Sequence, residues 1–287
     1  MTLGQVNTLV AHRAKALKDV RHFFDTRGYL EVDTQALSPF AAIDTYIDPI
    51  VTTENLFLHT SPEYAMKKLL CEGSGSIYFL GHVFRKEEVG SLHNNEFTMI
   101  EWYKTETSKE KFLEEVCDLL FLFIGKKNIK KISYNDAWQR YASKPEIDTT
   151  GWQADEINHY IWATSVEPKF NKDEVTMIYD FPKEEAALAK THFVDGVELA
   201  ERFEFYYGGI ELANGYHELS DPIEQMRRFE EINQKRSLQK KASLPIDKTL
   251  IKALEKGLPK NTYGIAVGFD RLFMLKHNLS HINQAQP

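Results

Sequence analysis

The sequence predicts an α+β fold in which an antiparallel sheet is flanked by helices. Two stretches have the pattern of a β-hairpin, at 78–104 and 197–219, and Gly208-Gly209 supplies a turn in the second. Stretches with helical periodicity or helix caps lie before, between and after them. The hairpins therefore predict the sheet, and the helices predict its cover.

The first hairpin mixes aromatic and charged side chains on one predicted face. Alternate residues of its two strands share that face: Ile77, Phe79, Val83, Arg85, Phe97, Met99, Glu101 and Tyr103. Arginine, carboxylate and tyrosine groups on an otherwise apolar sheet are costly to desolvate unless they meet a polar ligand or one another. The residues alone leave two interpretations open, an ion-pair ladder on a solvated face and a ligand site.

Composition limits the class of protein. The chain has 287 residues, 43% of them hydrophobic and 27% charged, which is typical of a globular protein of one large or two small domains. A net charge of −7 argues against broad nucleic-acid binding. No apolar window approaches 18 residues, so we expect no membrane segment, no export and a cytoplasmic location. The chain has only two cysteines, Cys71 and Cys117, which excludes a disulfide framework.

Caps and periodicity locate the helices. Residues 8–26 form an amphipathic helix that Gly28 stops, and Thr107 with Glu110 fits a capping box before the next helix. Asp221 caps a long charged helix. Between these helices, residues 126–172 are interpreted as an insertion with short helices at 133–142 and 153–165, and its lysines at 126–131 as a solvated connection.

Three glutamates stand out without a motif. Glu63 follows Pro62 in a first helical turn, where a carboxylate that complements the helix dipole needs no further function. Glu211 and Glu218 flank Asn214-Gly215, whose tendency to form a bulge could bring both to one side of a strand. Such a pair is either a repulsive liability or a divalent-cation site, and its oxygen ligands suit magnesium.

The C-terminal stretch YGIAVGFDRLF joins a glycine-spaced strand to a helix near Asp270-Arg271. Gly264 and Gly268 permit close backbone approach, and the helix start with Arg271 would favour an anion. A generic strand-to-helix junction is the alternative. The chain has no Rossmann or Walker loop, no HExxH and no G-x-S-x-G, so the corresponding classes of enzyme are excluded.

These stretches resemble, in order, the three motifs of class II aminoacyl-tRNA synthetases. Residues 84–87, 93–97 and 101–103 (FRKE, HNNEF, EWY) resemble motif 2 in its lysyl-tRNA synthetase form, and 264–271 (GIAVGFDR) resembles motif 3. The first helix with 28–32 resembles motif 1, which forms homodimers, although Gln35 stands at its usual proline and Asn95 at a common proline of motif 2. The resemblance implies one class II catalytic domain over 1–287.

A closer similarity is to the family of elongation factor P (R)-β-lysine ligases. The chain begins at motif 1 without room for an anticodon-binding domain, it is acidic, and Ala266 stands where lysyl-tRNA synthetases have glycine. One added methyl group discriminates by about 1–3 kcal/mol. The resemblance implies ATP-dependent activation of (R)-β-lysine and its transfer to elongation factor P, without tRNA. A truncated lysyl-tRNA synthetase-like enzyme that activates L-lysine and a catalytically silent paralogue are the alternatives.

The resemblance also implies a role for each candidate residue. The catalytic residues would be Arg85, Glu211 and Arg271. The residues that bind ATP would be Arg85, Lys86, Glu87, Asn94, Phe97, Glu211, Leu212, Gly268 and Arg271. Those that bind the amino acid would be Ser61, Pro62, Glu63, Glu101, Tyr103, Glu218 and Ala266, because carboxylates suit the two ammonium groups of a diamino acid. Glu211 and Glu218 would hold Mg²⁺ on the triphosphate.

Overall fold

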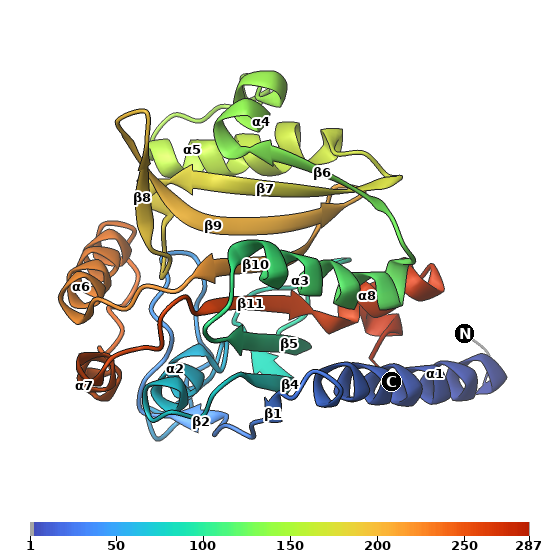
Figure 1. The fold of residues 1–287 in the computed structure, drawn as a ribbon. Coiled ribbons are helices and arrows are strands. Elements are labelled where there is room, and N and C mark those ends of the chain that lie inside the picture. The colour runs from blue at the N-terminus through green and yellow to red at the C-terminus, as the bar shows by residue number, and fades with distance from the viewer. Residues whose placement is uncertain (1–2, 287) are drawn as a thin grey trace. The chain divides into compact units, whose positions relative to one another are not determined.

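The computed structural model describes residues 3–286, which form two compact units (Figure 1). The first unit contains the chain up to Gly125 and again from Glu218 onward, and the second contains Lys126–His217. Each unit has its own strands and helices. None of the helices within residues 3–286 has the length and apolarity needed to cross a bilayer.

The first unit is built on four adjacent strands in the order β1-β4-β5-β11. Their bounds are β1 Leu30–Glu31, β4 Ile77–Phe84, β5 Glu96–Lys104 and β11 Tyr263–Gly268. β1 is parallel to β4, and the other two pairs are antiparallel. A small separate pair joins β2 (Leu37–Ser38) to β3 (Phe57–Leu58). The predicted α+β class, an antiparallel sheet with flanking helices, is confirmed.

The register of the β4–β5 hairpin confirms the predicted face. Phe79 lies opposite Glu101, Ile77 opposite Tyr103, and Val83 opposite Phe97. Because directly opposed residues in an antiparallel pair project to the same side, the aromatic and charged side chains of both strands share one face. The position of Glu101 at the middle of β5 follows from this register.

Helices pack against these strands through large aromatic side chains. The helices of the first unit are α1 Leu3–Asp25, α2 Glu63–Cys71, α3 Lys109–Ile124, α6 Pro222–Leu238, α7 Lys248–Lys256 and α8 Phe269–His277, followed by a 3₁₀ turn at Ile282–Gln284. Phe24 of α1 stacks on Tyr78 with ring centroids 4.3 Å apart, and all of Phe24, Tyr78 and Trp102 are fully buried. Burial of such rings supplies much of the hydrophobic stabilisation of a core.

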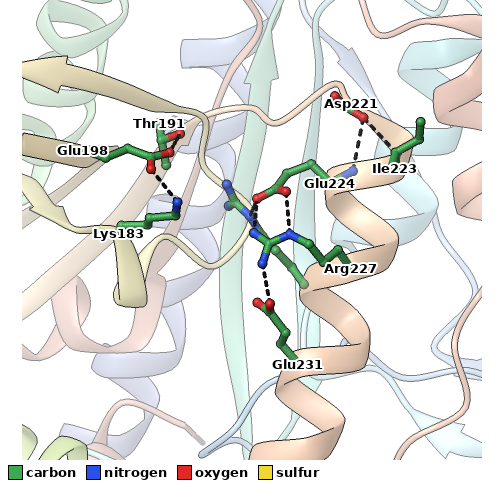
Figure 2. A network of polar contacts seen from close by, with 9 residues as sticks. Lys183, Thr191, Glu198, Asp221, Ile223, Glu224, Arg227 and Glu231 are labelled. Atoms are coloured by element: carbon green, nitrogen blue, oxygen red, sulfur yellow. Dashed lines mark hydrogen bonds and ion pairs between the residues drawn. The ribbon is translucent and has the colours of Figure 1, made fainter.

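The helix ends agree with the sequence at Gly28 and Asp221 and differ at α3. Gly28 has φ +75°, and Asp221 Oδ1 accepts hydrogen bonds from the N–H groups of Ile223 (2.8 Å) and Glu224 (3.1 Å), as Figure 2 shows. The capping box at Thr107 was wrong, because Ser108 is the N-cap and its Oγ accepts from Lys111 N. A serine is as good a cap as a threonine, so adjacent candidates are hard to rank from sequence.

The exposed side of α6 carries paired charges, whereas Arg228 and Arg236 of the same helix are buried. Arg227 donates two hydrogen bonds to Glu224, of 2.8 and 2.7 Å, and also pairs with Glu231 one turn later (Figure 2). The Arg227 side chain is about half exposed, at 46%. Exposed pairs of this kind add little to stability, because solvent screens them.

The second unit has the strand order β10-β9-β7-β6, with β8 paired to β9. Its strands are β6 Asn128–Ser133, β7 Glu174–Pro182, β8 Thr191–Val194, β9 Val197–Tyr207 and β10 Ile210–His217. Its helices are α4 Tyr134–Tyr141 and α5 Ala154–Ile161, which a π-helix continues over Trp162–Val166; single 3₁₀ turns follow at Glu167–Lys169 and Lys183–Glu185. The two short helices predicted in the 126–172 stretch are confirmed.

The interpretation of 126–131 as a connection was wrong in part, because Asn128 begins strand β6. β6 pairs with β7 in parallel and lies at the end of the strand order. Lysines on an edge strand hinder pairing with another chain. Lys130 and Lys131 of this stretch therefore belong to an edge strand, and the abundance of lysines was wrongly interpreted as typical of a loop.

The second hairpin confirms the predicted turn and has a bulge, although not at the predicted position. Gly208 and Gly209 have φ of +62° and +77°, and the register between β9 and β10 shifts between Glu211 and Ala213. At the neighbouring β8–β9 hairpin, Thr191 Oγ1 donates to Glu198 Oε1 (2.7 Å), and Lys183 pairs with the same carboxylate (Figure 2). The predicted position of the bulge at Asn214-Gly215 was wrong, because these residues pair regularly with Glu204 and Phe203.

A buried arginine holds α1 to β5 and α8. Arg13 Nη1 donates to Asp270 Oδ1 (2.6 Å) and to Ala285 O (2.7 Å), and Nη2 donates to Thr98 Oγ1 (2.7 Å). The Asp270 side chain is 1% exposed and also accepts from Thr98 N (2.8 Å). Three segments far apart in the sequence therefore meet at one ion pair.

We expect Arg13→Met to lower the free energy of unfolding by about 3–5 kcal/mol, because it leaves the buried carboxylate of Asp270 without its charge partner. The matched control is Arg21→Met on the same helix, which removes the exposed pair of Arg21 with Glu31 and should cost at most about 1 kcal/mol. Urea denaturation of the three proteins measures both values. Equal losses in the two variants would contradict the role given to Arg13.

Candidate functional site

Three carboxylates and a lysine lie together in the first unit, where Glu101, Glu218 and Lys67 are buried and Glu63 is partly buried. Glu63 opens α2, Glu101 lies on β5, and Glu218 follows the second unit in the chain, its N–H donating to Thr262 O (3.0 Å). Lys67, one turn after Glu63, places its Nζ 2.8 Å from Glu63 Oε1 and 2.6 Å from Glu218 Oε2. The structure thus brings together the glutamates that the sequence predicts for the amino acid.

Glu101 is held by two hydroxyl groups. Ser61 Oγ donates to its Oε2 and Tyr103 OH to its Oε1, both at 2.7 Å, and Ser61 Oγ also accepts from Glu63 N at 3.0 Å. Burial, and then the negative charge of Glu63, raise the pKa of Glu101 from 4.5 to about 8. Burial and Glu101 together raise the pKa of Tyr103 well above 10. Glu101 is therefore a carboxyl group that an added cation would ionise.

Lys67 is the member of the cluster that the sequence analysis missed. Its side chain is 0% exposed. Burial alone would lower its pKa, but Glu218 and Glu63 outweigh burial and raise the pKa above 10.5. The four-residue spacing from Glu63 was the available signal, because Glu and Lys at i and i+4 are neighbours on a helix.

The strand β11 makes room for the cluster through a glycine. Gly264 lies opposite Tyr103 in the ladder, and a Cβ at this position would overlap Glu218 Oε1 and the Tyr103 ring. Ala266 is directly opposite Glu101, so its methyl group is a cross-strand neighbour of that carboxyl group. Pro62 is the residue just before α2 rather than its first residue.

The predicted nucleotide residues of motif 2 form a second group in the same unit. The guanidinium carbon of Arg85 lies 5.1 Å from the centroid of the Phe97 ring, within the range of a cation–π contact. Arg85 Nε donates to Thr60 O (3.4 Å), and its Nη1 is 3.5 Å from Glu88 Oε1. Arg85 is thus held beside the carbonyl that precedes Ser61.

Lys86 and Glu87 extend outward from this group. Their side chains are 58% and 77% exposed, and Lys86 Nζ lies 2.9 Å from Glu87 Oε1. Glu87 has φ +64°, a left-handed conformation that is uncommon for a residue with a side chain. Such conformations occur often at ligand sites, although they do not identify a ligand.

Asn94 and Arg271 are each held by a neighbouring segment. Asn94 Nδ2 donates to Gln286 Oε1 (2.7 Å), and Arg271 Nη2 donates to His93 Nε2 (2.6 Å). Gly268 is the N-cap of α8, and a Cβ there would meet the Arg271 side chain at 3.6 Å. The motif 2 loop and the motif 3 helix start are therefore in direct contact.

Glu211 and Leu212 lie on β10, in the second unit. Glu211 is opposite Tyr206 and is partly exposed, at the bulge, whereas Leu212 is buried at 2% exposure. Within residues 3–286 no group of three or more His, Cys, Asp or Glu side chains is arranged to hold a metal ion. The magnesium role of Glu211 and Glu218 stays a prediction.

We expect the stability of the protein to depend on pH through Glu101. The folded protein retains a proton at Glu101 between pH 4.5 and about 8 that the unfolded chain releases, so this stabilisation is complete below pH 4.5 and is lost as pH rises through about 8. The effect is at most about 1.4 kcal/mol per pH unit. Glu101→Gln carries no such proton, so wild type should lose stability relative to this variant from pH 5 to 8 in urea denaturation. Parallel pH curves would contradict the assignment.

Comparison with known proteins gives one family for the whole chain. Residues 3–287 match the model of class II tRNA synthetases for aspartate, lysine and asparagine (D, K and N). A protein of Pasteurella multocida named elongation factor P–(R)-β-lysine ligase is 41% identical over 98% of this chain and 94% of its own. Proteins of the same name from Actinobacillus succinogenes and an Enterobacter species are 40% and 39% identical, over 98% and 92% of this chain and 94% and 89% of theirs. The chain belongs to the class II tRNA synthetase family, in the group of the elongation factor P (R)-β-lysine ligases.

Proposed function

We propose that this protein uses ATP to activate (R)-β-lysine as an acyl-adenylate and transfers the β-lysyl group to a lysine side chain of elongation factor P. The observation that carries the proposal is the cluster of Glu63, Glu101 and Glu218 around Lys67 in a chain of this family. Carboxylates in such number suit a substrate with two ammonium groups. The relatives' name supplies the amino acid and the acceptor protein.

The amino-acid half of the site consists of the cluster and its strand neighbours. Ser61 and Tyr103 orient Glu101 through their hydroxyl groups, and Glu63 and Glu218 face the substrate's ammonium groups. Ala266 beside Glu101 narrows the pocket wall by one methyl group relative to glycine. This difference favours a β-amino acid by about 1–3 kcal/mol.

The nucleotide half consists of the motif 2 loop and the start of α8. Arg85 binds the α-phosphate, and Phe97 and Arg271 stack on the adenine. Lys86, Glu87, Asn94 and Leu212 complete the nucleotide contacts, and Gly268 lets the ligand approach the backbone. Two hydrogen bonds support this assignment of the nucleotide half. Arg271 donates to His93 and Arg85 donates to Thr60, so each arginine predicted to bind ATP is held by a neighbouring segment.

The chemistry depends on positioning and charge. The carboxylate of the amino acid attacks the α-phosphorus, a new P–O bond forms, and pyrophosphate leaves while Arg85 stabilises the added negative charge. In the second step the neutral ε-amine of the acceptor lysine attacks the activated carbonyl, an amide forms and AMP leaves. The proton of the amine passes to solvent or to the departing phosphate.

Magnesium on the triphosphate belongs to the proposal, with Glu211 and Glu218 as its oxygen ligands. Glu211 is a partly exposed carboxylate and suits a hard cation. Glu218 also contacts Lys67 through Oε2, so its carboxylate would serve both Lys67 and the ion. Magnesium would neutralise the charge of the leaving pyrophosphate.

The proposal includes a homodimer, a cytoplasmic location and the absence of a tRNA substrate, with 1–287 as one catalytic domain. The exposed Val10 and Leu30 of the motif 1 region support the homodimer, with 43% and 58% exposure. The net charge of −7 supports a protein acceptor over tRNA. A truncated lysyl-tRNA synthetase-like enzyme is less favoured, because the relatives are named as protein ligases.

The direct experiment supplies ATP and magnesium with (R)-β-lysine or L-lysine, and with elongation factor P or tRNA. We expect an increase in the intact mass of elongation factor P by one β-lysyl group, greater with (R)-β-lysine than with L-lysine, and no acylation of tRNA. Mass spectrometry and acid precipitation of labelled tRNA measure the two outcomes. Labelled tRNA together with unmodified elongation factor P would contradict the proposal.

A further inference from the structure

We propose that Lys67 is a positioning residue for the amino-acid substrate, one that fixes Glu63 and Glu218 in place and sets the charge of the site to match a diamino acid. The inference rests on the proposed function and adds a residue to it. It starts from the two ion pairs of Lys67 Nζ, at 2.8 Å to Glu63 and 2.6 Å to Glu218.

The geometry ties two parts of the first unit to one ammonium group. Glu63 stands on the first turn of α2, and Glu218 stands on a segment whose backbone bonds to Thr262, just before β11. Lys67 engages one oxygen of each carboxylate, so the separation of the two carboxylates is set by a single nitrogen atom. Gly264 then leaves the space that the Glu218 side chain needs.

The charge of the cluster points to the substrate class. With the carboxylates of Glu63, Glu101 and Glu218 ionised, three negative charges face the one positive charge of Lys67, and two negative charges are left. A diamino acid brings two ammonium groups and turns its carboxylate toward the nucleotide. Without Lys67, the three carboxylates would carry one negative charge more than the two ammonium groups of the substrate can balance. An unbalanced buried charge is costly, so Lys67 matches the site to this substrate.

Stabilisation of the fold alone does not explain why a lysine is buried at position 67. A buried ion pair often contributes no more than well-packed apolar residues of the same volume, because desolvation offsets the attraction. Lys67 is 0% exposed and Glu218 1%, so both groups bear the full cost of desolvation. A positioning role accounts for a fully buried ammonium group at the point where substrate ammonium groups are expected.

The neighbouring residue offers a matched control. Lys68 lies on the same helix and pairs with one buried carboxylate, Asp247, at 2.9 Å, but outside the cluster. Lys68→Met therefore removes a lysine and an ion pair from α2 without changing the charge around Glu101. A general loss of α2 stability would affect both variants alike.

The test is amino-acid-dependent ATP–pyrophosphate exchange by wild type, Lys67→Met, Lys67→Arg and Lys68→Met. Lys67→Met should raise the KM for (R)-β-lysine about tenfold or more, because one partner of a buried charge pair is lost, while the KM for ATP stays within about twofold. Lys67→Arg, which keeps the charge, should give an intermediate KM for the amino acid. Lys68→Met should retain the wild-type value.

A folded Lys67→Met variant with an unchanged or lower KM for the amino acid would overturn the proposal, as would an equal rise in the KM for ATP. If Lys67→Met does not fold, Lys67→Gln decides, because it removes the positive charge and keeps a hydrogen-bonding side chain; a wild-type KM for the amino acid would then overturn the proposal. Failure of the proposed function is visible separately, as no exchange by wild type with either (R)-β-lysine or L-lysine.

Discussion

The cluster of three carboxylates and one buried ammonium group is the constraint on which the rest of the site depends. Glu63, Glu101 and Glu218 come from a helix, a strand and a connecting segment, and Lys67 joins two of them. Such a cluster is costly unless its charges are matched. Within the fold, the hydroxyl groups of Ser61 and Tyr103 each donate a hydrogen bond to one oxygen of Glu101.

The β4–β5 hairpin gives this cluster its place beside the nucleotide residues. Arg85 with Phe97 and Glu101 with Tyr103 occupy the two ends of one face. Under the proposed function, the substrate carboxylate meets the α-phosphate between these two ends. A sheet face that mixes aromatic rings and charge is therefore better explained as a ligand site than as a solvated ion-pair ladder, since Glu101 is only 2% exposed.

Much of this arrangement could be predicted from the sequence because period-two alternation fixes which strand residues share a face. The register of β4 and β5, the Gly208-Gly209 turn and the Asp221 cap follow from local rules of that kind. The buried position of Lys67 and the Arg13–Asp270 pair could not be predicted from the sequence. A buried cationic residue and a surface one look alike in a sequence until their tertiary partners are known. The strand β6 was missed for the related reason that its lysines are typical of loops as well as edge strands.

Under the proposed function, two ammonium groups of the substrate balance the charge left by the carboxylates and Lys67. Calorimetric binding of (R)-β-lysine and of 3-aminohexanoic acid, which lacks the second amine, tests it on the wild-type protein with a non-hydrolysable ATP analogue present. We expect the monoamino acid to bind about 100-fold more weakly or worse, because it lacks the second ammonium group that the polar groups around Glu101 would bind. Affinities within a few-fold of each other would contradict the claim.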